Sequence, residues 1–281
     1  MVEVTPLRGT FAARIDGFDP SDIDAVTTQT LNQAWLQFAV LHFPRLRLAS
    51  SALLRLARIF GEVRPQPLQR KEYLVPEHPE LRVVSSEHRD TFGDGLPLRT
   101  GGSWHTDHSQ LHHPPSGTIL SAITIPASGG DTRFCDQRAA YAELSSERKA
   151  AVSNLVGEHV YNSRYSPRRL QKLRAGEVAD QAPALHPLVR VHPQNGRTVL
   201  YFNPIRIERF VGQNEETSQR LIEELTRHCE QEAFVYRHRW SEGDVLLWDN
   251  RQVMHMVDHD YPKGALRVMH RALIYTGHEW Q

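Results

Sequence analysis

The first sixty residues alternate between strand-like and helix-like patterns of apolar positions. Short apolar runs on either side of Gly9 predict two strands within residues 2–16. Apolar side chains three or four positions apart then predict two helices, and the continuous apolar run 39–43 between them predicts a buried strand. The first helix is expected to follow a cap in residues 19–22, and the second to end near Gly61.

The later part of the chain is dominated by short apolar runs that alternate with turns. Such runs predict strands at residues 117–125, 198–202, 234–239, 244–248 and 267–275. Helical spacing appears only twice among them, at residues 137–155 and 214–232. Many short strands with few helices between them favour a β-rich α+β fold, an antiparallel sandwich or barrel, over a doubly wound parallel sheet.

Residues 62–103 break this pattern, because they are rich in proline, glycine and charge around one strand-like stretch at 81–84. They predict a long ordered loop, and loops of that length in a compact domain are often functional. No shift in composition marks a boundary, so residues 1–281 are expected to form a single domain.

Composition narrows the class of protein. The 33 basic and 33 acidic residues cancel, which excludes a strongly basic nucleic-acid binder. Two cysteines exclude a disulfide scaffold. Neither a signal-peptide pattern nor an apolar stretch of about 18 residues is visible, so we expect a cytoplasmic protein with no membrane partner. The 16 histidines suit metal or acid–base chemistry.

The pair His105 and Asp107 is the most informative short motif. On a strand, residues two apart face the same side roughly 6.6–6.8 Å apart, so an imidazole and a carboxylate can converge on one ion. Together with a distant histidine, such a pair makes the facial triad of non-haem Fe(II) oxygenases. Two polar residues at a loop edge would explain the pair equally simply.

Spacing does not select the third ligand from several histidines. Some candidate histidines lie in the later strands. Others lie next to His105 and Asp107, where they could bind metal or substrate. For His112 and His113 a solvated loop position is the better explanation. The set comprises His255, His259, His270, His108, His112 and His113.

Two further segments suggest anion binding. Residues 129–132 predict a turn into a strand, for which an ordinary hairpin is sufficient. In the run 267–271, strand alternation places Arg267 and Arg271 on one face, about 13 Å apart along the strand. Two arginines on one strand face are costly unless they meet anions, and a guanidinium matches a carboxylate well. An exposed basic face is the alternative.

Taken together, the motifs resemble the taurine dioxygenase (TauD/TfdA) family of Fe(II)- and 2-oxoglutarate-dependent dioxygenases, over nearly the whole chain. Their order and spacing carry the resemblance. The matching segments are Phe60-Gly61-Glu62, Trp104-His105-Thr106-Asp107, Pro126 to Thr132, His186 to Asn203, Trp248-Asp249-Asn250-Arg251 with His255, and Arg267 to Arg271.

The resemblance implies a double-stranded β-helix, a jelly-roll-like barrel with flanking helices and lid loops. It implies that His105, Asp107 and His255 bind Fe(II), with 2-oxoglutarate and O₂ as cosubstrates. Thr132 and Arg267 would hold the distal carboxylate of 2-oxoglutarate. Arg271 would act at the active site, near the other cosubstrate carboxylate and the acidic group of the primary substrate.

The expected activity is oxidation, by hydroxylation, of a small anionic organic molecule, with release of succinate and CO₂. One alternative is a tailoring oxygenase that desaturates or cyclises an amino-acid-like intermediate. Another is a non-catalytic β-barrel binding protein. We also expect a homo-oligomer. Residues 88–103 and 161–180 are rich in glycine, proline and charge and flank the motifs, so we expect them to form mobile covers over the site. The resemblance does not carry over a particular substrate, because the residues after Asp107 are unusually polar.

Overall fold

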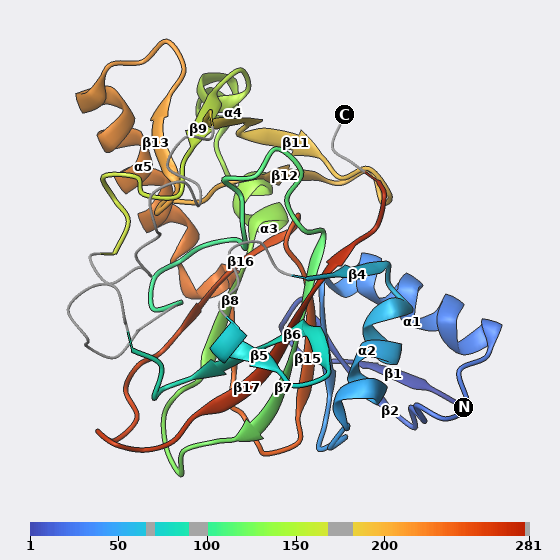
Figure 1. Ribbon diagram of the computed structural model, residues 1–281. Helices are drawn as coiled ribbons and strands as arrows, with labels where there is room; N and C mark the ends of the chain where they lie inside the picture. Colours follow the sequence, from blue (N-terminus) through green and yellow to red (C-terminus); the bar gives the residue numbers. More distant parts are fainter. Residues whose placement is uncertain (66–70, 90–100, 168–181, 279–281) are drawn as a thin grey trace.

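The larger of two facing sheets is the central scaffold of the molecule (Figure 1). The structure, a computed structural model, describes residues 1–65, 71–89, 101–167 and 182–278. In this sheet the strand order is β1-β2-β3-β15-β7-β17-β6-β5, with β4 also paired to β17. All its pairs are antiparallel except β2 with β3. The strands are β1 (Glu3–Pro6), β2 (Ala12–Asp16), β3 (Val40–Phe43), β4 (Glu62–Arg64), β5 (Leu74–Val75), β6 (His78–Ser85), β7 (Gly117–Thr124), β15 (Val245–Asp249) and β17 (Val268–Tyr275).

A smaller antiparallel sheet, β14-β8-β16, faces the larger one. Its strands are β14 (Val235–His238), β8 (Thr132–Asp136) and β16 (Val253–Val257). The register places Phe134 opposite both Tyr236 and His255. Two further small sheets are β10-β9-β13 and β11-β12. They comprise β9 (Val156–His159), β10 (Ala184–Pro187), β11 (Val189–Val191), β12 (Thr198–Leu200) and β13 (Ile207–Phe210).

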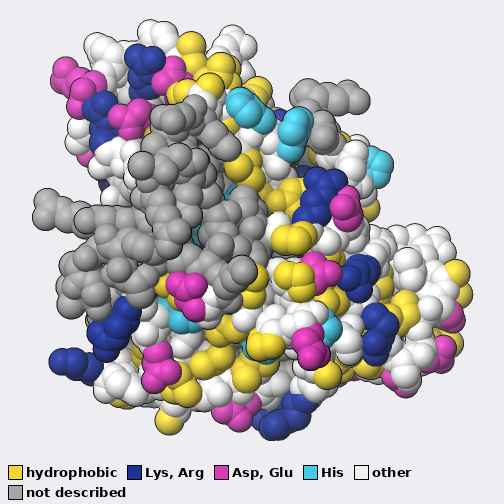
Figure 2. Space-filling model, viewed as in Figure 1, with side chains coloured by type: hydrophobic (Ala, Val, Ile, Leu, Met, Phe, Trp, Pro, Cys, Tyr) yellow, Lys and Arg dark blue, Asp and Glu magenta, His cyan; other side chains and the backbone are white. Residues whose placement is uncertain are grey.

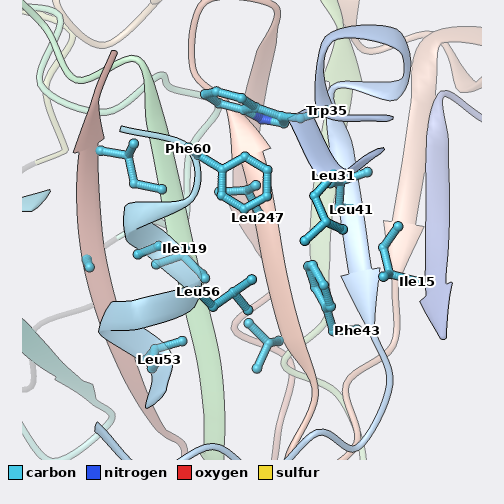
Figure 3. Close-up of a cluster of buried hydrophobic side chains, with 14 of the residues drawn as sticks. Ile15, Leu31, Trp35, Leu41, Phe43, Leu53, Leu56, Phe60, Ile119 and Leu247 are labelled. Atoms are coloured by element: carbon cyan, nitrogen blue, oxygen red, sulfur yellow. The ribbon is translucent and has the colours of Figure 1, made fainter. Parts of the chain in front are cut away.

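Helices cover the outer faces of the two facing sheets. Against the larger sheet lie α1 (Ala25–Phe38) and α2 (Ser50–Arg58), and Figure 3 shows the aromatic and aliphatic side chains packed between helix and strand. A second apolar cluster joins the outer side of the smaller sheet to α3 (Gln137–Ala142), α4 (Ser146–Val152) and α5 (Glu215–Cys229). Short 3₁₀ helices occur at Lys71–Tyr73 and Glu232–Phe234.

Side chains from both sheets meet in a third buried cluster, which fills the interior between them. Leu120, Leu246 and Trp248 come from the larger sheet, and Phe134 and Val253 from the smaller. Because strand side chains alternate between the two faces, each sheet has one face toward its helices and one toward this interior. The interior between the sheets is therefore bounded on each side by a sheet and the helices packed on its outer face.

The sequence correctly predicts the strand-rich second half and both N-terminal helices, with three corrections. Helix α1 begins after the N-cap Asp24, not after residues 19–22. The stretch 137–155 is two helices, because Ser145 caps α4. Residues 62–103 are not one loop, since β4, β5 and β6 lie in their described part.

On the face shown in Figure 2, basic and acidic side chains are interspersed, as the balance of 33 and 33 suggests. Among the described residues, no helix is both long and apolar enough to cross a membrane.

Candidate active site

Three side chains with metal-ligand atoms meet beside the interior core. The ligand atoms of His105, Asp107 and His255 all lie within 4.8 Å of one another. The Asp107 carboxylate is 4.0 Å from Nε2 of each histidine. Asp107 and His255 are buried, and the imidazole of His255 packs against Phe134 and Trp248. Two imidazoles and one carboxylate are the donor set of a facial triad.

The chain brings these ligands together differently from the sequence prediction. His255 lies in the middle of β16, but His105 and Asp107 do not share a strand. His105 instead forms an isolated antiparallel bridge with His255, with N–H···O distances of 3.0 and 2.8 Å, and Asp107 lies in the turn that follows. A single bridge is therefore enough to fix both imidazoles, with ring centroids 4.2 Å apart.

A chain of buried hydrogen bonds orients the Asp107 carboxylate. Trp248 Nε1 donates to Asn250 Oδ1 at 3.0 Å, and Asn250 Nδ2 donates to Thr118 Oγ1 at 2.9 Å. Thr118 Oγ1 in turn donates to Asp107 Oδ2 at 2.7 Å. Sequence reasoning identified Asn250 only within a motif and missed Thr118, because a threonine on an apolar strand gives no signal of its own.

The other carboxylate oxygen faces Arg271, whose Nη1 donates to Asp107 Oδ1 at 3.2 Å. Burial alone would raise the pKa of Asp107, but Arg271 and the two ligand histidines hold it below its usual value. Burial lowers the pKa of both His105 and His255. His105 Nδ1 lies 2.8 Å from the carbonyl of Ser103, so that carbonyl holds the proton on Nδ1 and leaves Nε2 free to ligate.

Arg267 is the second conspicuous feature, because its side chain is buried and incompletely hydrogen-bonded. The residue is 5% exposed, and Nε donates to the carbonyl of Gly130 at 3.2 Å. Its Nη2 is buried and has no hydrogen-bond partner among the described residues. Burial lowers its pKa to about 10, so the guanidinium remains charged at neutral pH. An unpaired buried donor of this kind suits a carboxylate ligand.

The turn before Thr132 explains how Arg267 approaches the backbone. Gly130 has φ +77°, and a Cβ there would lie 3.2 Å from Arg267 Nε. This turn connects β7 of the larger sheet with β8 of the smaller, so the hairpin explanation is wrong. Thr132 Oγ1 accepts a hydrogen bond from Trp240 Nε1 at 2.9 Å, which leaves its own hydroxyl proton free for a ligand.

The three triad residues, Thr132, Arg267 and Arg271 line one cavity of about 170 Å³. Sequence reasoning did not single out two more arginines in its wall, Arg82 on β6 and Arg206 between β12 and β13. Burial, with Arg271 nearby, lowers the pKa of Arg82 to about 10. Arg206 donates to the carbonyl of Tyr161, and its guanidinium lies 4.7 Å from the centre of that ring. The sequence gives only a weak indication of these two arginines, because each is a single basic residue between apolar neighbours.

The remaining candidate histidines take different positions. His108 and His259 line the cavity, but neither belongs to the triad group, and His259 Nδ1 lies 3.2 Å from Tyr261 Oη. The His270 side chain is absent from the described cavity lining. His112 and His113 are exposed and outside that lining, as predicted.

The expected covers fall mostly outside the described residues. Of the segments 88–103 and 161–180, positions 90–100 and 168–180 are not described. Their described ends do contribute to the cavity wall, for example at His88 and Pro167.

Comparisons with known proteins agree with this geometry. The family model "Taurine catabolism dioxygenase TauD, TfdA family" matches residues 3–273. An (S)-phenoxypropionate/alpha-ketoglutarate-dioxygenase from Sphingobium herbicidovorans is 32% identical, over 90% of this chain and 88% of that protein. An alpha-ketoglutarate-dependent 2,4-dichlorophenoxyacetate dioxygenase from Cupriavidus pinatubonensis is 30% identical, over 96% of both chains. The crystal structure of AAD-2 in complex with Mn(II) and N-oxalylglycine superposes with a TM-score of 0.81 at 27% identity, covering 98% of this chain and 97% of the other.

Proposed function

Because the chain belongs to the TauD/TfdA family of dioxygenases, we propose that it hydroxylates a small anionic organic molecule in the cavity described above. It is an Fe(II)- and 2-oxoglutarate-dependent dioxygenase, an oxidoreductase that uses O₂ and releases succinate and CO₂. The family match over residues 3–273 supports one catalytic domain built on a double-stranded β-helix. The non-catalytic binding protein is thereby set aside.

His105, Asp107 and His255 would hold the iron. The observation that carries this assignment is their convergence, with neutral imidazoles and an ionised carboxylate, in a cavity that is also lined by Arg267, whose buried Nη2 lacks a partner among the described residues. Three protein ligands leave positions open for the cosubstrates. Iron held there would supply the chemistry of O₂ activation, with 2-oxoglutarate oxidised to succinate and CO₂. Thr118 donates to Asp107 and would keep the carboxylate oriented for the metal.

Thr132 and Arg267 would bind the distal carboxylate of 2-oxoglutarate. Arg267 and Thr132 both line the cavity, and Arg267 Nη2 and the Thr132 hydroxyl each have a donor to offer. Arg271 would lie nearer the reacting centre, because it already donates to an Asp107 oxygen. Its guanidinium would face the inner carboxylate of the cosubstrate or the acid group of the substrate.

The charge of the cavity supports an anionic primary substrate. Four arginines line it, whereas Asp107 is the only carboxylate among its described lining residues. Two of them, Arg267 and Arg271, are assigned above, so Arg82 and Arg206 would attract the substrate. The relatives named above act on phenoxypropionate and 2,4-dichlorophenoxyacetate, and a further one, 30% identical, is a sulfate ester dioxygenase.

Replacement of single histidines tests the metal assignment. His255→Ala should abolish 2-oxoglutarate turnover and iron binding, because it removes one of three ligands. His259→Ala is the matched control and should retain both, since His259 lies in the same wall outside the triad. Iron content and succinate release are measured for each. Loss of iron in His259→Ala but not in His255→Ala would show that the third ligand is wrongly assigned.

Substrate-dependent succinate release tests the proposed reaction. Aryloxy acids, sulfate esters, sulfonates and amino acids are supplied in parallel, with product identified by mass. A hydroxylated anion, or its breakdown products, is the expected result. Desaturated or cyclised amino-acid products would instead favour a tailoring oxygenase.

A further inference from the structure

Outside the cavity, a second buried group of metal-ligand side chains connects the two facing sheets. His42 lies on β3 of the larger sheet, His238 ends β14 of the smaller, and Asp244 immediately precedes β15. Their ligand atoms all lie within 4.8 Å of one another, and none of the three lines the active-site cavity. We refer to His42, His238 and Asp244 as the inter-sheet cluster.

The contacts between Asp244 and the two histidines are long for hydrogen bonds. Asp244 Oδ2 lies 3.5 Å from His42 Nε2 and 3.4 Å from His238 Nε2. Hydrogen bonds from N–H to oxygen are usually about 2.7–3.2 Å long. Both Nε2 atoms are buried and without a hydrogen-bond partner among the described residues. The side chains of His238 and Asp244 are each only 4% exposed, and that of His42 is 15% exposed.

The two distances from Asp244 Oδ2 to the histidine Nε2 atoms match those between ligands of one metal ion. Zinc bonds to histidine nitrogen and carboxylate oxygen are about 2.0–2.2 Å, so tetrahedral ligands lie about 3.3–3.5 Å apart. From this match and the two unpartnered nitrogens, we propose that the inter-sheet cluster binds a Zn²⁺ ion. Water would complete the coordination, because three side chains leave one tetrahedral position.

The surroundings of the cluster hold each ligand in place. Asp244 Oδ1 accepts from the backbone N–H of Arg45 at 2.9 Å, and Oδ2 accepts from that of Ser241 at 2.9 Å. His238 Nδ1 lies 3.0 Å from Tyr236 Oη, the type of outer partner that orients a metal-binding imidazole. Burial lowers the pKa of His238, which keeps the imidazole neutral and able to ligate.

Zinc here would act on structure rather than on catalysis. In the register of the smaller sheet, His238 lies opposite Thr132. Trp240, whose ring is 4.7 Å from that of His238, donates to the Thr132 hydroxyl. A metal shared by β3 and β14 would therefore fix the strand that supports Thr132. This assignment does not depend on the substrate or on the iron ligands.

Cobalt titration of full-length protein tests the site, with Co²⁺ as the spectroscopic substitute for Zn²⁺. All proteins carry His255→Ala, which removes one triad ligand. This background should bind one Co²⁺ with the intense visible absorption of tetrahedral coordination, and Zn²⁺ should displace it. Adding His42→Gln should abolish that absorption. Adding His228→Gln should leave it unchanged, because His228 Nε2 is hydrogen-bonded to the carbonyl of Ala140 at 2.7 Å.

The same experiment can overturn the proposal. Absence of the tetrahedral band in the His255→Ala background, or its persistence after His42→Gln, means that the cluster binds no zinc. His238→Gln replaces His42→Gln if the latter does not give the circular dichroism spectrum of the folded protein. Succinate release by His42→Gln in otherwise unaltered protein should persist. This separates failure of the zinc site from failure of the proposed activity.

Discussion

At the scale of single residues, Arg267 has a buried donor that a ligand could satisfy. A buried guanidinium with one unpartnered nitrogen is destabilising, and a carboxylate that reaches it gains a charge-assisted hydrogen bond. Arg267 differs from Arg271 in its protein partner, because Arg267 donates to the Gly130 carbonyl whereas Arg271 donates to the Asp107 carboxylate. Both arginines line the same cavity, and we propose different roles for them.

Exchange of each arginine for lysine should separate these roles. Arg267→Lys keeps the charge but loses the planar fork, so the dissociation constant for 2-oxoglutarate should rise about ten- to a hundredfold. Arg271→Lys should act mainly on substrate binding and on the ratio of product to 2-oxoglutarate consumed. Anaerobic titration calorimetry with Fe(II) measures the first effect and coupled product assays the second. Equal weakening of 2-oxoglutarate by both, with coupling intact, would contradict the division.

At the scale of elements, the hydrogen-bond chain from the β15–β16 turn through β7 to Asp107 links scaffold and site. Thr118→Val keeps the shape of the side chain but leaves Asn250 Nδ2 and Asp107 Oδ2 each without one bond. We expect about ten- to a hundredfold weaker Fe(II) binding, the usual effect of losing an outer-shell partner. Competitive metal titration measures it. Thr124→Val, near the end of the same strand, is the control and should bind Fe(II) normally.

The helices and strands also show how much of the fold can be predicted from the sequence. Strands with long apolar runs, such as β7 and β17, and helices with clear spacing, such as α5, were predicted within a few residues. The short strands of the smaller sheets were mostly missed, because three to five residues carry too little periodicity. The His105–His255 bridge and the crossing at Gly129–Gly130 depend on pairing between distant segments, which no local pattern encodes.

The same limit applies to the site. Motif order identified His105, Asp107, His255 and Arg267, and the structure places all four in one cavity wall. Arg82 and Arg206 were not singled out, because a lone arginine in an apolar stretch usually marks a solvated face. Only packing of β6 against β17 and the position of the β12–β13 loop bring them to the cavity.

At the scale of the whole molecule, the proposed cosubstrate site spans both sheets. Thr132 and His255 belong to the smaller sheet, whereas Arg267 directly precedes β17 of the larger. Fe(II) and 2-oxoglutarate should therefore stabilise the sheets together, by about 2.7 kcal/mol at a concentration one hundred times the dissociation constant. Hydrogen exchange should slow in β8 and β17 alike. Protection confined to β8 and β16 would place the cosubstrate on the smaller sheet alone.

Among the described lining residues of the cavity there are four arginines and one carboxylate, and this charge affects which dissolved anions the enzyme attracts. The chain as a whole has no net charge, so it exerts little attraction on ions at a distance. Within a Debye length of these side chains, about 8 Å at physiological ionic strength, their positive charges favour the approach of anions. Abundant small anions such as phosphate and sulfate then become natural rivals of the substrate. The apparent preference of the enzyme will depend on the ionic medium as well as on the fit of the substrate.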